Sequence, residues 1–119
     1  MGLHVSFDLP DTDITVLEAI HLSFLTLFLE ELPEPVDDGH TDFWVEASLL
    51  DEVELTLIER FDTAGVSPAI SAATAIEDLR HHSEDAFDHE TLLHLHLGAV
   101  RRLRQAVMEH GPLVCAWSA

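Results

Sequence analysis

The two ends of the chain carry patterns of apolar residues that are typical of β-strands. Residues 3–9 alternate with period two, and Pro10 and Asp11 end the pattern. At the other end, the apolar run 113–117 follows a Gly-Pro pair. We predict that this run is a strand and that it pairs with residues 3–9.

A long apolar run between Ile14 and Leu29 predicts a helix near the start of the chain. Thr15 and Glu18 have the spacing of a capping box, in which the hydroxyl accepts a backbone N–H and the carboxylate reaches back to the cap. We expect a helix over residues 15–32, ended by Pro33. Because it is apolar on nearly every side, it should be central or lie in an interface. A buried strand in its second half is the alternative.

Residues 33–42 form a predicted loop, because proline, glycine and carboxylates follow one another there without an apolar period. A short strand is expected over residues 43–47, directly after this loop. These two segments separate the first predicted helix from the second.

A second helix is predicted over residues 49–61, where apolar residues recur at helical spacing. Ser48 and Asp51 form another capping signature, and Gly65 supplies a C-terminal stop. The same segment contains a strand-like alternation of apolar and polar residues around Leu55, so a strand is the alternative.

Two more helices are predicted in the second half of the chain. Ser67 and Pro68 are an N-cap followed by proline at the first helical position, which predicts a helix over residues 68–82. Asp88 can cap a long helix over residues 89–110, and the Gly-Pro pair after it ends that helix.

The predicted elements fit one domain over residues 1–119, a size that buries a single core. Its fold class is α+β, mostly helical with about four helices and a small sheet built partly from the two end strands. An all-α bundle is the alternative.

The charge of the chain narrows the choice of partners. Twenty-three acidic and five basic side chains give a net charge of −18. Residues 1–59 hold fifteen of the carboxylates and no Lys or Arg, so the halves carry −15 and −3. Nucleic acid and anionic membranes are therefore excluded as expected partners, since both need clustered bases.

Three explanations of this acidity compete. Intrinsic disorder needs few apolar residues, and the hydrophobic content of 47% argues against it. Salt adaptation should replace large aliphatic residues, yet Leu and Phe stand in dense runs. An acidic surface that meets a basic partner is the explanation we favour, because unneutralised like charges cost stability.

Residues 30–54, the acidic band, are the most specific feature of the sequence. They contain ten carboxylates and no base, with Phe43 and Trp44 among them. Aromatic side chains supply contact area while carboxylates steer a basic partner, so the band predicts a binding surface. Its alternative is an ordinary solvated face with one aromatic in the core. The expected partner-binding residues are Glu30, Glu31, Glu34, Asp37, Asp38, Asp42 and Trp44.

The histidine-rich segment between residues 81 and 110 offers a second hypothesis. His81, His82, Asp85 and His89 are side chains that bind zinc or iron, so a metal-binding protein or metalloenzyme is the alternative function. The spacing matches no metal motif, and His94 and His96 would lie about 200° apart on a helix. We therefore expect no bound metal and no cofactor.

Catalytic motifs are absent from the sequence, so we expect that this protein is not an enzyme. Nucleophile elbows, phosphate loops and dinucleotide fingerprints do not occur. Cys115 stands in an apolar run, which predicts an unreactive buried thiol. Arg101, Arg102 and Arg104 are expected to pair with carboxylates of the same chain.

Size and charge together predict a small cytoplasmic inhibitor that occludes the active site of a basic protein. Immunity proteins and antitoxins are examples of this class, and their toxin partners act on nucleic acids or nucleotides. The Ile14–Leu29 run contains Glu18 and is shorter than the ~20 residues of a membrane span. A homodimer through the first predicted helix is compatible with this function.

Overall fold

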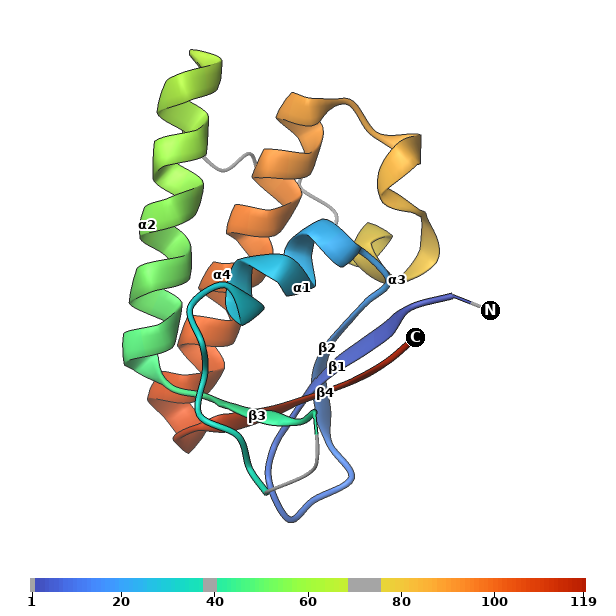
Figure 1. Ribbon diagram of the computed structural model, residues 1–119, viewed down its shortest axis with the longest axis vertical. Coiled ribbons are helices and arrows are strands. Elements are labelled where there is room, and N and C mark those ends of the chain that lie inside the picture. Colours follow the sequence, from blue (N-terminus) through green and yellow to red (C-terminus); the bar gives the residue numbers. More distant parts are fainter. Residues whose placement is uncertain (1, 38–40, 69–75) are drawn as a thin grey trace.

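The computed structural model describes residues 2–37, 41–68 and 76–119 (Figure 1). In chain order, its elements are β1 (His4–Asp8), β2 (Thr15–Ala19), α1 (Leu22–Leu29), β3 (Phe43–Val45), α2 (Ala47–Ala64), α3 (Asp78–His81), the 3₁₀ turn η1 (Glu84–Ala86), α4 (His89–His110) and β4 (Leu113–Ser118). This is the predicted α+β class, and the all-α alternative is wrong.

The four strands form one antiparallel sheet in the order β2-β1-β4-β3. The predicted pairing of the two chain ends is confirmed, because β1 and β4 are the central pair and run from His4 opposite Ser118 to Asp8 opposite Val114. Both ends of the chain therefore lie close together (Figure 1). The predicted short strand at residues 43–47 is also confirmed, as the three-residue edge strand β3.

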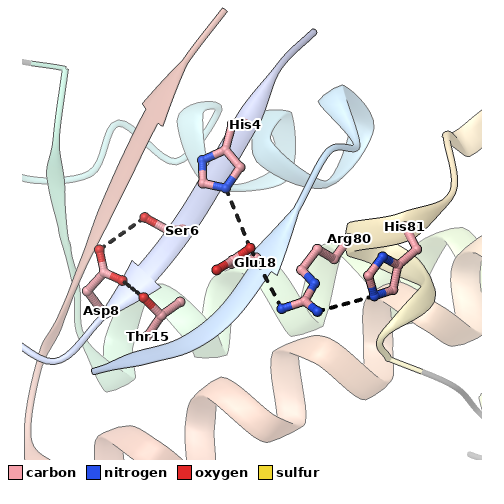
Figure 2. Close-up of polar contacts among 7 residues, drawn as sticks. All are labelled: His4, Ser6, Asp8, Thr15, Glu18, Arg80 and His81. Carbon is pink, nitrogen blue, oxygen red and sulfur yellow. Dashed lines mark hydrogen bonds and ion pairs between the residues drawn. The ribbon is translucent and has the colours of Figure 1, made fainter. Parts of the chain in front are cut away.

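One face of the sheet joins the core, and the other faces outward. Alternate strand residues such as Phe7 and Cys115 are fully buried in a cluster with side chains of α1, α2 and α4. Phe7, Phe24 and Phe28 form an aromatic group in this cluster, with ring centroids 5.2 to 5.9 Å apart. The outward face carries polar side chains, among them Ser6 (Figure 2).

The prediction of one helix over residues 15–32 is wrong. Its first five residues form β2, and the helix α1 begins only at Leu22. Thr15 does not cap a helix. Its hydroxyl donates to Asp8 across the β1–β2 hairpin, over 2.7 Å (Figure 2). Glu18 lies 3.6 Å from the His4 ring and 4.0 Å from the Arg80 guanidinium. Hairpin pairing with the neighbouring strand β1 overrode the capping signal.

The N-terminus of α1 receives its side-chain hydrogen bonds from a residue far along the chain. The side chain before the helix makes no capping bond. Instead the Glu84 carboxylate of η1 accepts hydrogen bonds from the backbone N–H and the hydroxyl of Ser23, at 3.1 and 3.0 Å. A carboxylate here is favourable because the first N–H groups of a helix lack internal partners.

The helix over residues 49–61 is confirmed against its strand alternative, as part of α2. Side chains one turn apart, from Leu50 to Phe61, are buried on one face. Gly65 ends the helix in the left-handed region at φ 70°. The capping signature at Ser48 and Asp51 is wrong, since α2 begins at Ala47 without a side-chain cap.

The last helix is confirmed with both of its ends. The Asp88 carboxylate accepts a hydrogen bond from the Thr91 backbone N–H at 2.7 Å, and the helix ends before Gly111. Part of the helix predicted over residues 68–82 lies outside the described residues, and α3 forms near its end. Within the described part of the chain, no helix is both long and apolar enough to cross a membrane.

Candidate partner-binding groove

A depression of about 260 Å³ lies between the segment after α1, the edge strand β3 and the start of α2. Figure 1 shows that segment passing beside β3 on its way from α1. We call the depression the acidic groove; its lining residues are Glu31, Leu32, Pro33, Glu34, Trp44, Glu46, Ser48, Leu49 and Glu52. Four of these nine are carboxylates, and none is basic.

Backbone hydrogen bonds position one wall of the groove against β3. The Trp44 N–H donates to the Glu34 carbonyl at 2.9 Å, and the Val36 N–H donates to the Asp42 carbonyl at 3.1 Å. These bonds cover the free edge of β3, which otherwise would invite pairing with another chain. They also bring Glu34 and Trp44 together, although ten residues separate them.

The two aromatic residues of the acidic band separate to opposite faces of β3. Phe43 is buried in the core, where its ring lies 6.4 Å from the Phe28 ring. Trp44, the next residue, points away from the core, because successive side chains of a strand alternate between faces. It is half-buried and lines the acidic groove. The expectation that one aromatic of the pair lies in the core is confirmed, and the binding role of Trp44 stays a prediction.

Leu32 is an apolar side chain that is exposed to solvent at the edge of the groove. It is 88% exposed, the most exposed large hydrophobic residue in the described part of the chain. Its backbone has φ 51°, in the left-handed region that glycine normally occupies after a helix. The Leu32 N–H donates to the Leu29 carbonyl at 3.1 Å and so closes the end of α1. A leucine here adds backbone strain without gaining burial.

Ion pairs divide the acidic band into a neutralised part and an open part. Arg104 bonds to Asp51 and lies 3.6 Å from Glu54, and Arg101 lies 3.9 Å from Glu54. The expected internal pairing of these two arginines is confirmed. Arg102 instead donates to the Val16 carbonyl at 3.3 Å.

No described basic side chain lies within 4 Å of the four groove carboxylates, whereas Asp51 and Glu54 of α2 have arginine partners. The groove therefore belongs to the part of the band whose negative charge no described basic side chain neutralises.

Three of the seven expected partner-binding residues, Glu31, Glu34 and Trp44, line the acidic groove. Asp42 instead lines an adjacent depression of about 280 Å³, which shares Leu32 and Pro33 with the groove. Glu30 and Asp37 are exposed and are not among the lining residues of the groove, and Asp38 lies outside the described residues.

Sequence reasoning missed six residues of the groove, namely Leu32, Pro33, Glu46, Ser48, Leu49 and Glu52. Glu46 and Glu52 belong to the acidic band, so their charge was visible, but their direction depended on where α2 begins. Leu32 and Leu49 had no distinguishing signal, because exposed and buried leucines look alike in sequence.

The residues of the metal hypothesis do not come together. His82 lies 4.0 Å from Asp78, and His81 lies 3.3 Å from Arg80. Among the described residues, which include His81, His82, Asp85 and His89, no three His, Cys, Asp or Glu side chains form a group that could hold a metal ion. The structure therefore supplies no observation in favour of the metal-binding alternative.

Two other histidines are buried together in the core. Nε2 of His21 lies 2.7 Å from the His82 carbonyl and so donates to it, which leaves Nδ1 as the acceptor. Nε2 of His96 lies 3.4 Å from that Nδ1. Burial, followed by electrostatic interactions with His21 and Arg60, lowers the pKa of His96 to about 3. The neutral His96 ring is thus part of the folded core.

Cys115 carries no reactive role in this arrangement. It is buried on the inner face of β4, as the apolar run around it predicts. Burial raises the pKa of the Cys115 thiol far above its ordinary value, with smaller contributions from Asp42 and Asp8. The nucleophilic thiolate is therefore disfavoured at neutral pH.

The acidic groove must be interpreted from its own chemistry. No protein-family model, curated protein or solved structure matches this chain. What the groove offers is a half-buried indole, exposed aliphatic surface and four carboxylates that have no basic partner among the described residues. This combination can bind a cationic partner that also presents apolar surface.

Proposed function

We propose that this protein is a small cytoplasmic inhibitor, without catalytic turnover, that docks its acidic groove on the basic active site of a partner protein. The observation that carries the proposal is the groove itself, which is lined by Trp44, Leu32 and four carboxylates, with no basic side chain of the described residues beside them. The protein would belong to the class of immunity proteins and antitoxins.

Each part of the groove has a task in such a complex. A net charge of −18 steers a basic partner toward the protein and raises the association rate. Apolar and aromatic side chains then supply affinity once water has left the contact. Enzymes that act on nucleic acids or nucleotides carry basic clefts, so grouped carboxylates can occupy the positions of phosphates.

The test compares two doubly substituted proteins of equal net charge. Glu34→Lys with Glu46→Lys reverses charge in the groove, and Asp62→Lys with Glu90→Lys reverses charge at exposed positions elsewhere. Each protein and the unaltered chain is immobilised, loaded with cell extract at low salt and washed with rising salt. The basic protein retained is identified, purified and assayed for activity with increasing amounts of each chain.

We expect the unaltered chain and the Asp62/Glu90 variant to retain the partner and to inhibit it at one-to-one stoichiometry. The Glu34/Glu46 variant should lose both properties. Equal retention by the two variants would show that the groove has no special role. A saturated partner that stays fully active would contradict inhibition.

A further inference from the structure

We infer that the acidic groove receives one arginine side chain of the partner, with the guanidinium stacked on Trp44 and paired with the carboxylates around it. This inference rests on the proposed function and names the group that the groove recognises. Charge complementarity carries the argument, because the lining contains four carboxylates and no base.

The carboxylates approach the indole from separate segments of the chain. Glu31 and Glu34 come from the segment after α1, Glu46 directly precedes α2, and Glu52 lies in the second turn of that helix. A cation at Trp44 would therefore meet carboxylates from different directions. A planar guanidinium can bond to more than one of them, because its five N–H groups form a rigid fork.

The rest of the lining favours arginine over lysine. Trp44 and Leu49 provide aromatic and aliphatic surface for a long aliphatic stem, while Leu32 adds apolar surface at the edge. A guanidinium stacks on an indole face and is more weakly hydrated than an ammonium group, so it gives up less on leaving water. Purely electrostatic attraction would not distinguish the two cations.

The arginines of the chain itself do not fill the groove. Arg101 and Arg104 contact Asp51 and Glu54 of α2, Arg80 contacts Glu18, and Arg102 contacts a carbonyl of β2. Neither these four arginines nor Arg60 is among the residues that line the groove. Arginine from outside is therefore the cation that complements it.

The experiment uses acetylated and amidated tri-arginine and tri-lysine peptides, which carry equal charge. The chain contains two tryptophans, so Trp117→Phe leaves Trp44 as the only indole that reports binding by fluorescence. The indole resonance of Trp44 in the unaltered chain, followed by NMR, supplies the same readout without any substitution.

We expect a saturable change at Trp44 with tri-arginine, and an affinity for tri-lysine at least about fivefold weaker. Glu34→Gln with Glu46→Gln should weaken tri-arginine binding about tenfold, whereas Asp62→Asn with Glu90→Gln should leave it nearly unchanged. Equal affinities for the two peptides, or tri-arginine binding that leaves Trp44 unaffected, would overturn the inference.

Failure of this inference and failure of the proposed function give different results. If the peptides bind equally but charge reversal in the groove abolishes inhibition of the partner, the proposed inhibitor function is supported and the arginine site is refuted. If tri-arginine binds as expected while no inhibited partner is found, the arginine site is supported and the proposed inhibitor function is refuted.

Discussion

Acid should destabilise this protein through His96, whose ring is only 4% exposed. The folded state keeps His96 neutral, because burial lowers its pKa from 6.5 to about 3. Between these two pH values the unfolded chain binds a proton at this position that the folded chain does not bind. The free energy of unfolding therefore falls as pH falls below 6.5, and it is restored above 6.5.

The expected size of the effect follows from the two pKa values. At pH 5 the unfolded histidine is almost fully protonated while folded His96 is neutral. The loss relative to pH 8 is about 2 kcal/mol from this side chain alone, at 1.36 kcal/mol for each pH unit. That is a large share of the stability of a small domain.

The measurement is urea denaturation at pH 8, 7, 6 and 5, followed by circular dichroism. His96→Leu removes the buried titrating ring and should make the pH dependence shallower by about 2 kcal/mol over this range. It also removes the neighbour of His21 Nδ1, so the variant should be less stable than the unaltered chain at pH 8. His110→Gln, at an exposed position of α4, is the control, and its plot of unfolding free energy against pH should run nearly parallel to that of the unaltered chain. Parallel curves for His96→Leu and the unaltered chain would refute the reasoning.

Three further substitutions test the fold. Leu32→Gly should raise the free energy of unfolding by about 1 kcal/mol, because glycine relieves the positive-φ strain at this exposed position. A thermal melt that shows destabilisation would contradict this expectation. The same substitution should weaken partner binding. Phe28→Ala should cost about 3 to 5 kcal/mol by opening a cavity in the core, measured by urea denaturation. Asp88→Ala should lower the melting temperature by several degrees because the Thr91 N–H loses its partner, whereas Glu46→Ala, at a helix start without a side-chain cap, should change it little.

Several elements were predictable from sequence because local interactions determine them. The start of α4 depends on Asp88 and a backbone group three residues later, and its end depends on a Gly-Pro pair. Gly65 ends α2 for an equally local reason, since it tolerates positive φ. The first strand was visible because its alternation with period two matches a half-buried sheet, and the last because it is a short apolar run after a Gly-Pro pair.

Residues 15–19 were mispredicted because hairpin pairing with β1 competes with the capping pattern. Thr15 and Glu18 satisfy a helix capping pattern, but β1 was available as a strand partner and Asp8 as a hydrogen-bond acceptor for Thr15. The cap that α1 does receive comes from Glu84, about sixty residues away. No pattern within a short window of sequence contains that information.

The sequence by itself determined the charge of this protein, the acidic band and the class of partner that such a surface favours, since these follow from composition. Tertiary structure decided which carboxylates share a groove. Arg101 and Arg104 neutralise one end of the band, while the bond from Trp44 to the Glu34 carbonyl assembles the other. The physical reason is that charge adds along a chain, whereas a binding site requires side chains from separate segments to meet.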